Sequence, residues 1–432
     1  METMVRMTWL FTFFVVSSAG LWAQYVPVPA PVQTRPVLLS GATAHLGNGQ
    51  VIENSLVAFE GGKITVVADA KVKRAFPDHL VVDASGKHLY PGFIAPNTTL
   101  GLTEIDGVRA TQDNSELGEM NPNIRSIVAY NTDSEITPTV RSMGVLMAEP
   151  TPKGGRISGT SSIVVLDAWN WEDAAYATDI AMHLNWPQTA SFNWREQRMV
   201  RNESYDEQLA AMDAYFREAQ SYCRGDAEQR GDNLRFEAMC PLFDGACRLL
   251  IHANNVQAIQ EGVLFAEKFK LKPVIVGGND SWMITDFLRS HEVPVILSST
   301  QRLPSREDED VDQPFKTPAQ LQQAGVTWCF GHNGYWQQRN LPFQAGQAVP
   351  FGLAYEEAIQ ALTGTTAKIF GIDGTTGTLE VGKDATLFLS AGDVLDMRTS
   401  KVTQAFIQGR EIDLNNKQEM LYNRFQQKYK QR

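Results

Sequence analysis

The chain has 432 residues, of which 43% are hydrophobic and 20% charged. This composition is that of a globular protein, and it excludes a disordered, collagen-like or coiled-coil chain. The length excludes a single minimal domain and allows two or three domains, or one barrel of about 250 residues with an appended module. A net charge of -11 disfavours nucleic acid or anionic lipid as a partner, whereas cations or neutral ligands fit better.

The first residues have the features of an export signal. Arg6 precedes an apolar run over residues 9–16, which is too short to span a bilayer, and small residues follow at 17–20. This pattern predicts a signal peptide over residues 1–23, cleaved after Ala23. We therefore expect a secreted or periplasmic protein with no membrane span after cleavage.

The chain contains four cysteines, Cys223, Cys240, Cys247 and Cys329. In an oxidising compartment they could pair. Cys240 and Cys247 are closest in sequence and could staple one local loop, but buried free thiols fit equally well. The sequence does not determine the connectivity.

A proline-rich stretch over residues 24–36 follows the predicted signal peptide. Such a stretch is extended and stiff, so we expect a solvated linker that does not pack on the rest of the chain.

Residues 37–92 alternate apolar runs with turn signals. The clearest unit has strand-like runs at 56–60 and 63–67 on either side of Gly61 and Gly62, which predicts a β-hairpin. A similar pattern returns at residues 372–412. We therefore expect the two ends of the chain to form one sheet structure.

Strands and helices alternate at a steady interval between residues 249 and 300. Strand-like runs at 249–251, 273–276 and 293–297 are separated by two stretches with helical periodicity. Consecutive βαβαβ units build a parallel sheet, either doubly wound or closed into a barrel. The βαβαβ units lie between the two terminal segments that we expect to form one sheet structure, and this position favours the barrel.

The last segment, 413–432, shows helical periodicity over residues 415–431. We expect this terminal helix to turn its apolar side inward and its basic side outward, with Met420, Leu421 and Phe425 on the first and Lys428 and Lys430 on the second.

Two motifs carry a resemblance to a known family. Residues 86–94, Gly-Lys-His-Leu-Tyr-Pro-Gly-Phe-Ile, resemble the start of the first barrel strand in the amidohydrolase superfamily, particularly its imidazolonepropionase-like members. Residues 361–385 are similar to that superfamily's passage from the last helix to the closing sheet. The resemblance implies an α/β fold, with a (β/α)8 TIM barrel over residues 93–371 and a composite β-sandwich made from both ends. It also implies metal-dependent hydrolysis of non-peptide C-N bonds.

Such a barrel needs imidazoles and carboxylates that bind Zn²⁺ or a similar ion and lower the pKa of its water. This chain has replaced most of them. Asn97 and Thr99 stand where the family has paired histidines, and Gly277 follows the strand where another histidine belongs. Asn333 stands at the position of the final-strand aspartate. We therefore predict a degenerate site without a tightly bound catalytic metal ion and predict no cofactor.

Two side chains remain as candidates for acid or base catalysis at the mouth of the barrel. His252 matches a histidine at the end of a middle strand, and Glu104 lies on the first loop. The alternatives are a hydrogen-bonded relic for His252 and a solvated loop residue for Glu104. If the strands align differently, three imidazoles could bind zinc: His183, His252 and His332.

The remaining candidates concern ligand binding. Asn97, Thr99 and Asn333 would face a ligand at the strand ends. Residues 153–162, with Arg156, have the glycines, hydroxyls and positive charge of an anion-binding loop, although a glycine turn between two strands explains them equally well. The acidic run 307–310 could select ligands by charge or simply be solvated.

The sequence therefore predicts an exported amidohydrolase-like barrel whose hydrolytic activity is altered or lost. The alternative is a non-catalytic protein that binds a small molecule, pairs with an active amidohydrolase, or forms a homo-oligomer.

Overall fold

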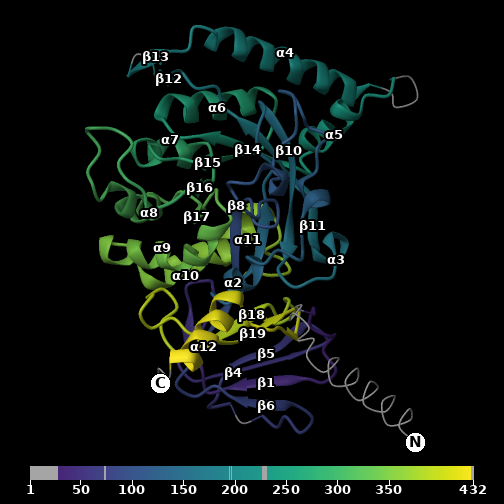
Figure 1. The fold of residues 1–432 in the computed structure, drawn as a ribbon, viewed down its shortest axis with the longest axis vertical. Helices are drawn as coiled ribbons and strands as arrows, with labels where there is room; N and C mark the ends of the chain where they lie inside the picture. Colours follow the sequence, from purple (N-terminus) through teal and green to yellow (C-terminus); the bar gives the residue numbers. More distant parts are fainter. Residues whose placement is uncertain (1–27, 73, 194, 196, 226–230, 430–432) are drawn as a thin grey trace, which may run out of the picture.

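The computed structural model describes residues 28–72, 74–193, 195, 197–225 and 231–429. The predicted signal peptide and the start of the predicted linker lie outside the described residues. Figure 1 shows a larger part in which helices surround a central sheet, and a smaller part built mainly of strands.

The central sheet has eight strands in the order β17-β16-β15-β14-β11-β10-β9-β8. In chain order these are β8 (Phe93–Thr98), β9 (Val145–Pro150), β10 (Ile157–Val165), β11 (Ala175–Asn185), β14 (Arg248–Ala253), β15 (Pro273–Gly277), β16 (Val295–Leu297) and β17 (Trp328–Phe330). The hydroxyl of Thr98 donates to the carbonyl of Gly334 at 2.8 Å, which brings the end of β8 to the segment after β17. The sheet is therefore a nearly closed barrel, as predicted.

One strand runs against the others. β10 is antiparallel to both β9 and β11, whereas β9 is parallel to β8 and β11 is parallel to β14. The connection between β9 and β10 spans only residues 151–156. A parallel crossover needs a dozen or more residues, so this short connection forces the reversal.

The helices lie mainly on the outside of the barrel (Figure 1). They are α2 (Thr137–Arg141), α3 (Trp171–Ala174), α4 (Tyr205–Arg224), α5 (Leu234–Phe243), α6 (Val256–Lys268), α7 (Thr285–Ser290), α8 (Gln313–Gln323), α9 (Leu341–Ala348), α10 (Tyr355–Leu362) and α11 (Gly364–Phe370), with α12 (Lys417–Tyr429) near the end of the chain. Short 3-10 turns span Arg109–Thr111, Ser126–Ala129, Ser281–Ile284, Trp336–Asn340 and Val349–Phe351.

The predicted βαβαβ unit is confirmed as β14-α6-β15-α7-β16. The side chain of Asn255 caps α6 by accepting from the N-H of Ala258 at 2.9 Å. Ile259 and Val263, one turn apart, are both fully buried. A polar cap and an apolar stripe thus fix where this helix starts and which side packs on the sheet.

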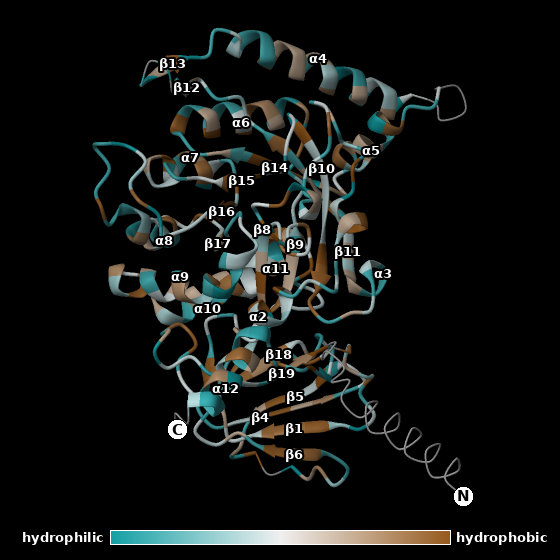
Figure 2. Ribbon diagram, in the orientation of Figure 1, coloured by the Kyte–Doolittle hydropathy of each residue, from teal (hydrophilic) through white to brown (hydrophobic). Residues whose placement is uncertain are grey.

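The smaller part contains two sheets that join both ends of the chain. A four-stranded sheet has the order β5-β4-β1-β6, and a six-stranded sheet has the order β20-β19-β18-β7-β2-β3. These strands are β1 (Val37–Ser40), β2 (Thr43–His45), β3 (Val51–Ile52), β4 (Ser55–Glu60), β5 (Lys63–Asp69), β6 (Leu80–Asp83), β7 (His88–Pro91), β18 (Leu387–Ser390), β19 (Val402–Ile407) and β20 (Arg410–Glu411). Figure 2 shows the hydrophobic character of several of them, and Phe59 and Phe406 bring the two ends together in one core. The predicted composite architecture is confirmed.

The predicted hairpin is β4-β5, with Gly61 and Gly62 in its turn at φ values of 57° and 82°. Glycine adopts these angles without the steric cost that a Cβ would add. A second hairpin joins β12 (Ala190–Asn193) to β13 (Arg198–Arg201).

No residue of the described part of the predicted linker is buried, but the expectation that it does not pack on the rest of the chain is wrong. Residues 28–36 form neither helix nor strand, but the N-H of Ala30 donates to Asp167 at 2.9 Å, and Arg410 donates to the carbonyl of Ala30 at 3.0 Å. Gln33 also accepts from the N-H of Gly62. These backbone groups have partners on the body of the protein, so the segment is fastened to it.

The prediction that α12 buries Met420, Leu421 and Phe425 is also wrong. No residue of α12 is buried, and these three side chains are exposed. The first turn of α12 contacts α2 through Gln418, which accepts from the hydroxyl of Thr139, and Lys417 pairs with Glu135 just before α2. The helical period predicted the helix itself, but no described part of the protein covers its apolar side chains.

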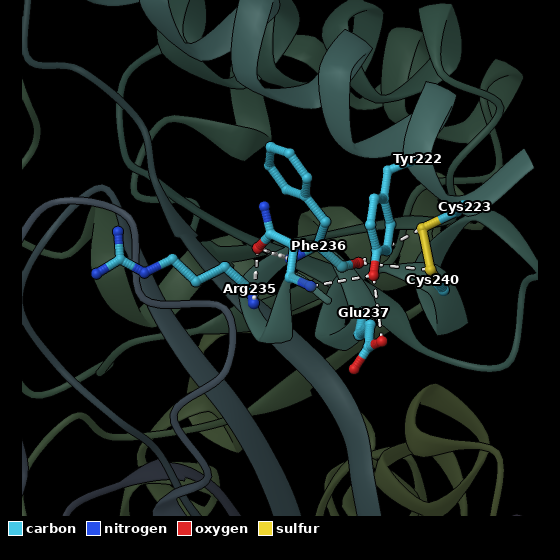
Figure 3. The surroundings of a disulfide bond; sticks show 7 residues. Tyr222, Cys223, Arg235, Phe236, Glu237 and Cys240 are labelled. Carbon is cyan, nitrogen blue, oxygen red and sulfur yellow. Dashed lines mark hydrogen bonds between the residues drawn. A yellow bond between two sulfur atoms is a disulfide. The ribbon is translucent and has the colours of Figure 1, made fainter. Parts of the chain in front are cut away.

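Of the two alternatives left open for Cys240 and Cys247, the local disulfide between them is not formed. Cys240 is bonded to Cys223, 17 residues earlier, and Figure 3 shows this disulfide where α5 packs on α4. Cys247 and Cys329 are free and buried. The pairing follows the packing of the two helices, which brings Cα atoms to 5.3 Å, and sequence separation does not reveal it.

Among the described residues, no helix is long and apolar enough to cross a membrane.

Candidate functional site

The strand ends of the barrel carry a buried polar network, which we call the strand-end network. Its members come from neighbouring elements of the sheet: Asn97 on β8, Glu149 on β9, Ser161 on β10, His183 on β11 and His252 on β14, with Lys153 on the loop after β9. Parallel strands end on one face of a barrel, which brings together the residues of β8, β9, β11 and β14. Ser161 reaches them from the middle of the antiparallel β10.

Glu149 is the centre of the strand-end network. Its carboxylate accepts from the N-H of Asn97 at 2.8 Å and from the hydroxyl of Ser161 at 2.5 Å, and lies 3.1 Å from Nε2 of His183. Glu149, Ser161 and His183 are completely buried. A buried carboxylate is costly unless its oxygens are hydrogen-bonded, and here three elements supply donors to it.

The two histidines are bonded to each other. Nδ1 of His183 lies 2.9 Å from Nε2 of His252. Because Nε2 of His183 faces the Glu149 carboxylate, we assign the proton of His183 to Nε2, which makes its Nδ1 the acceptor. His252 then donates through Nε2 and keeps an unprotonated Nδ1.

His252 is neutral at pH 7. Desolvation holds its pKa well below the usual range for histidine, and the neighbouring His183 and Lys153 lower it further. A neutral imidazole with an unprotonated nitrogen can accept a proton, although a strongly lowered pKa makes it a weak base.

Lys153 brings a positive charge to the network. Its Nζ donates to Oδ1 of Asn97 at 2.9 Å, and burial lowers its pKa to about 8, opposed by the attraction of Glu149. Asn97 has a φ of 52°, which asparagine tolerates better than most residues. Asn97 thus connects the ammonium of Lys153 to the carboxylate of Glu149 through its side chain and backbone.

These residues do not fit the metal centre that the barrel fold implies. The two imidazoles use facing nitrogens to bond each other, the carboxylate is occupied by three donors, and a lysine ammonium lies beside them. Throughout the described ranges, no group of three or more His, Cys, Asp or Glu side chains is arranged to hold a metal ion. The alternative site of His183, His252 and His332 is therefore not assembled: two meet, and His332 instead accepts from the N-H of Gly334 at 3.0 Å.

Other predicted candidates lie outside the network. Glu104 is half-buried on the loop after β8, where it accepts from Asn131 at 3.2 Å. Asn333 is exposed, and Thr99 is buried just past the end of β8. None of these three has a hydrogen bond to the strand-end network within the part of the chain described.

The guanidinium of Arg156, a candidate for anion binding, is bonded to acceptors of the protein. It donates to the carbonyl of Asn185 at 2.6 Å and to Gln208 on α4 at 3.2 Å. Nearby, the side chains of Ser158 and Asn185 donate to carbonyls of the same glycine loop. The loop is a turn between β9 and β10, held by donors that bind its carbonyl groups.

The acidic run 307–310 is only partly solvated. Glu309 is buried and accepts from Arg302 at 2.6 Å and from the N-H of Ser305 at 2.6 Å, contacts that lower its pKa to about 2. Its neighbour Asp308 remains exposed.

Sequence reasoning missed Glu149, and it included Ser161 and Lys153 only as members of the predicted anion-binding loop 153–162. Glu149 ends a fully buried strand just before Pro150, and a charged residue at the end of such a strand was the available signal. Ser161 gave no such signal, because it lies in the middle of a strand whose reversed direction only the structure shows.

A separate cleft of about 730 Å³ lies where the opposite end of the barrel meets the smaller part. Its lining includes Asp384, which pairs with the ammonium of Lys63 and accepts from the hydroxyl of Tyr176. The start of β11 supplies Tyr176, so the cleft is remote from the strand-end network.

Comparisons with known proteins support the fold. A family model described as the amidohydrolase family matches residues 339–412. An amidohydrolase from Thermotoga maritima MSB8 superposes with a TM-score of 0.78 at 21% identity, covering 87% of this chain and 99% of that one. A putative prolidase from Bifidobacterium longum gives 0.55 at 16% identity, covering 91% and 100%. An adenosine deaminase from Xanthomonas campestris with bound zinc gives 0.54 at 14% identity, covering 93% and 99%.

None of the curated proteins compared with the chain matches it. At these identities the solved structures establish a shared fold, whereas the family model matches the segment that contains the predicted motif at 361–385. The imidazolonepropionase-like branch stays a prediction. The matched segment at 339–412 resembles the amidohydrolase family, and the whole chain shares its barrel and extra sheets with solved amidohydrolase and prolidase structures.

Proposed function

We propose that this chain is a superfamily member in which metal-dependent hydrolysis of C-N bonds has been lost, and that its barrel mouth binds a small polar molecule. The family and fold support a hydrolase-type function in general terms. The observation that carries the finer proposal is the internal bonding of the strand-end network, with the ammonium of Lys153 beside Asn97 and Glu149.

The chemistry of hydrolysis gives the reason. A metal ion lowers the pKa of bound water and so supplies a nucleophile at neutral pH. To bind here, a dication would have to approach the Lys153 ammonium and break the 2.9 Å contact between His183 and His252. Both steps are unfavourable, so we expect the network to act as a structural core of the barrel mouth.

The first experiment measures metal and activity together. We expect protein purified without chelators to contain far less than one metal ion per chain, and to show no chelator-sensitive hydrolysis of N-acyl amino acids or cyclic amides. Stoichiometric metal, with turnover lost in chelator and restored by Zn²⁺, would overturn the proposal.

A second candidate function is slow hydrolysis without a metal ion, with His252 as general base. It is favoured by the unprotonated Nδ1 assigned to His252, and Glu104 is too poorly connected to the network to share the role. In that case His252→Ala would abolish turnover while His291→Ala, at the end of α7, would leave it unchanged. Equal turnover in both variants would exclude this candidate.

We also propose that the chain is exported. The signal-like segment at residues 1–23 supports this, as does the Cys223–Cys240 disulfide, because disulfides persist in oxidising compartments. Expression of the full chain in a bacterium should yield a periplasmic protein that begins at Gln24, as checked by intact mass. An uncleaved cytoplasmic product would contradict it.

A further inference from the structure

Helix α12 has an apolar face with no partner in the described chain. The large apolar side chains of this face are between 37% and 63% exposed: Leu421, Tyr422, Phe425 and Tyr429. A helix that is not packed against its own domain normally loses more conformational entropy than it regains, so an exposed stripe of this kind points to an interaction surface.

The helix is nevertheless held in a defined position. Asn416 caps its start by accepting from the N-H of Glu419 at 3.0 Å, and also donates to Ser142 at 3.3 Å. Gln418 accepts from the hydroxyl of Thr139 on α2, and Lys417 pairs with Glu135. The first turn is thus fastened to the body, while the remaining turns extend along the surface (Figure 1).

The pattern along α12 combines apolar and basic residues on one side. Leu421, Phe425 and Tyr429 follow one another at intervals of four and form a stripe. Arg424 and Lys428, also four apart, form a row beside it, and both are exposed. The opposite side carries uncharged amides, Glu419 and the single apolar side chain of Met420.

We propose that α12 docks the protein onto an anionic lipid surface, with its aromatic stripe at the headgroup boundary and Arg424 and Lys428 on the lipid phosphates. A helix that lies at a membrane interface has this combination: a face of polar side chains, aromatic side chains on the other face, and basic residues beside them. The proposal is independent of what the barrel binds.

Charge complementarity favours lipid over the alternatives. The whole chain has a net charge of -11, which had argued against anionic lipid, but the charges are unevenly distributed. Residues 417–429 contain three basic residues and one acidic residue. A twofold contact between copies through α12 would place two basic rows together, which like-charge repulsion disfavours.

The test uses the mature chain, from Gln24, and sedimentation with vesicles. Vesicles of equal parts phosphatidylcholine and phosphatidylglycerol should bind the protein, and vesicles of phosphatidylcholine alone should not. Arg424→Gln with Lys428→Gln should weaken binding by about 30-fold. Phe425→Ser with Tyr429→Ser should abolish binding to these vesicles, because it removes the aromatic stripe.

The matched control changes the net charge equally on the other side of the helix, through Asn423→Asp with Gln427→Glu, and should bind nearly as wild type does. Equal binding to both kinds of vesicle, or equal losses in the two charge variants, would overturn the proposal. A dimer in solution that Phe425→Ser with Tyr429→Ser converts to monomer would assign the stripe to a second copy and overturn it as well.

Discussion

Glu149 illustrates how single residues decide the chemistry of this barrel. Its carboxylate is fully buried and receives donors from Asn97, Ser161 and His183, which lie on three other strands. Each donor satisfies part of a charge that would otherwise be very costly to bury. The same bonds direct these groups toward one another, and this arrangement is the basis of the proposal that the barrel mouth does not hold a metal ion.

His252 gives a prediction for pH dependence. Its folded pKa lies well below that of an unfolded histidine, near 6.5, so below about pH 6.5 the unfolded chain binds a proton that the folded chain excludes. The free energy of unfolding should therefore fall as pH falls from 7 to 5, by up to about 1.4 kcal/mol per pH unit for this residue. His88 and His332, whose pKa values burial also lowers, add in the same direction.

Urea denaturation at several pH values tests this. His252→Gln should have a shallower pH slope than wild type, whereas Ser161→Ala, which disturbs the same network without removing an imidazole, should keep the full slope. An unchanged slope in His252→Gln would show that this imidazole titrates alike in both states.

At the scale of elements, α4 and α5 depend on each other. Their packing brings Cys223 and Cys240 together, and closing a loop of 17 residues by a disulfide stabilises a fold by about 3 kcal/mol. The surroundings in Figure 3 add a hydrogen bond from Tyr222 to Glu237 across the same two helices. The disulfide and this hydrogen bond therefore stabilise the packing of α4 on α5 directly, in addition to the contacts of these helices with the barrel core.

Thiol counting tests the pairing. Burial raises the pKa of Cys247 and of Cys329 to about 12, so neither thiol should react with a disulfide reagent at pH 8 in the native protein. In denaturant without reductant, two thiols per chain should react, and four after reduction. Four reactive thiols before reduction would contradict the disulfide.

At the scale of the whole molecule, Asp167 joins segments far apart in the sequence. It is buried and pairs with Arg141 at 2.8 Å and with Arg410 at 3.2 Å, and it accepts from the N-H of Ala30 at 2.9 Å. These contacts tie the start of the described chain and β20 of the smaller part to the barrel. The two parts are therefore expected to unfold together.

Asp167→Asn should lower the free energy of unfolding by about 3 to 5 kcal/mol, because it leaves the buried guanidinium of Arg141 without its counter-charge. Chemical denaturation measures the change. Asp286→Asn, which removes an exposed partner of Arg289, is the control and should cost less than about 1 kcal/mol. A similar small loss in both variants would mean that Asp167 does not join the two parts energetically.

The sequence by itself determined those features that depend on neighbours along the chain. The turn at Gly61 and Gly62 and the βαβαβ unit from β14 to β16 could be predicted, because local period and turn chemistry specify them. The motif at 361–385 was recognised by its resemblance to a family, and the family model matches the same segment. The end of β8 near Asn97 could also be located from its apolar run, whereas the comparison of Asn97 with a family histidine rests on the resemblance alone.

Only the tertiary structure decided which distant groups meet. The contact of Glu149 with His183 joins residues 34 apart, and that of Lys153 with Asn97 joins residues 56 apart. Such contacts depend on strand order and register, and here on the reversal of β10, which no local pattern encodes. The cysteine pairing and the exposure of α12 have the same explanation. Periodicity determines which residues share a face of a helix, but the packing of the whole chain determines which residues that face contacts.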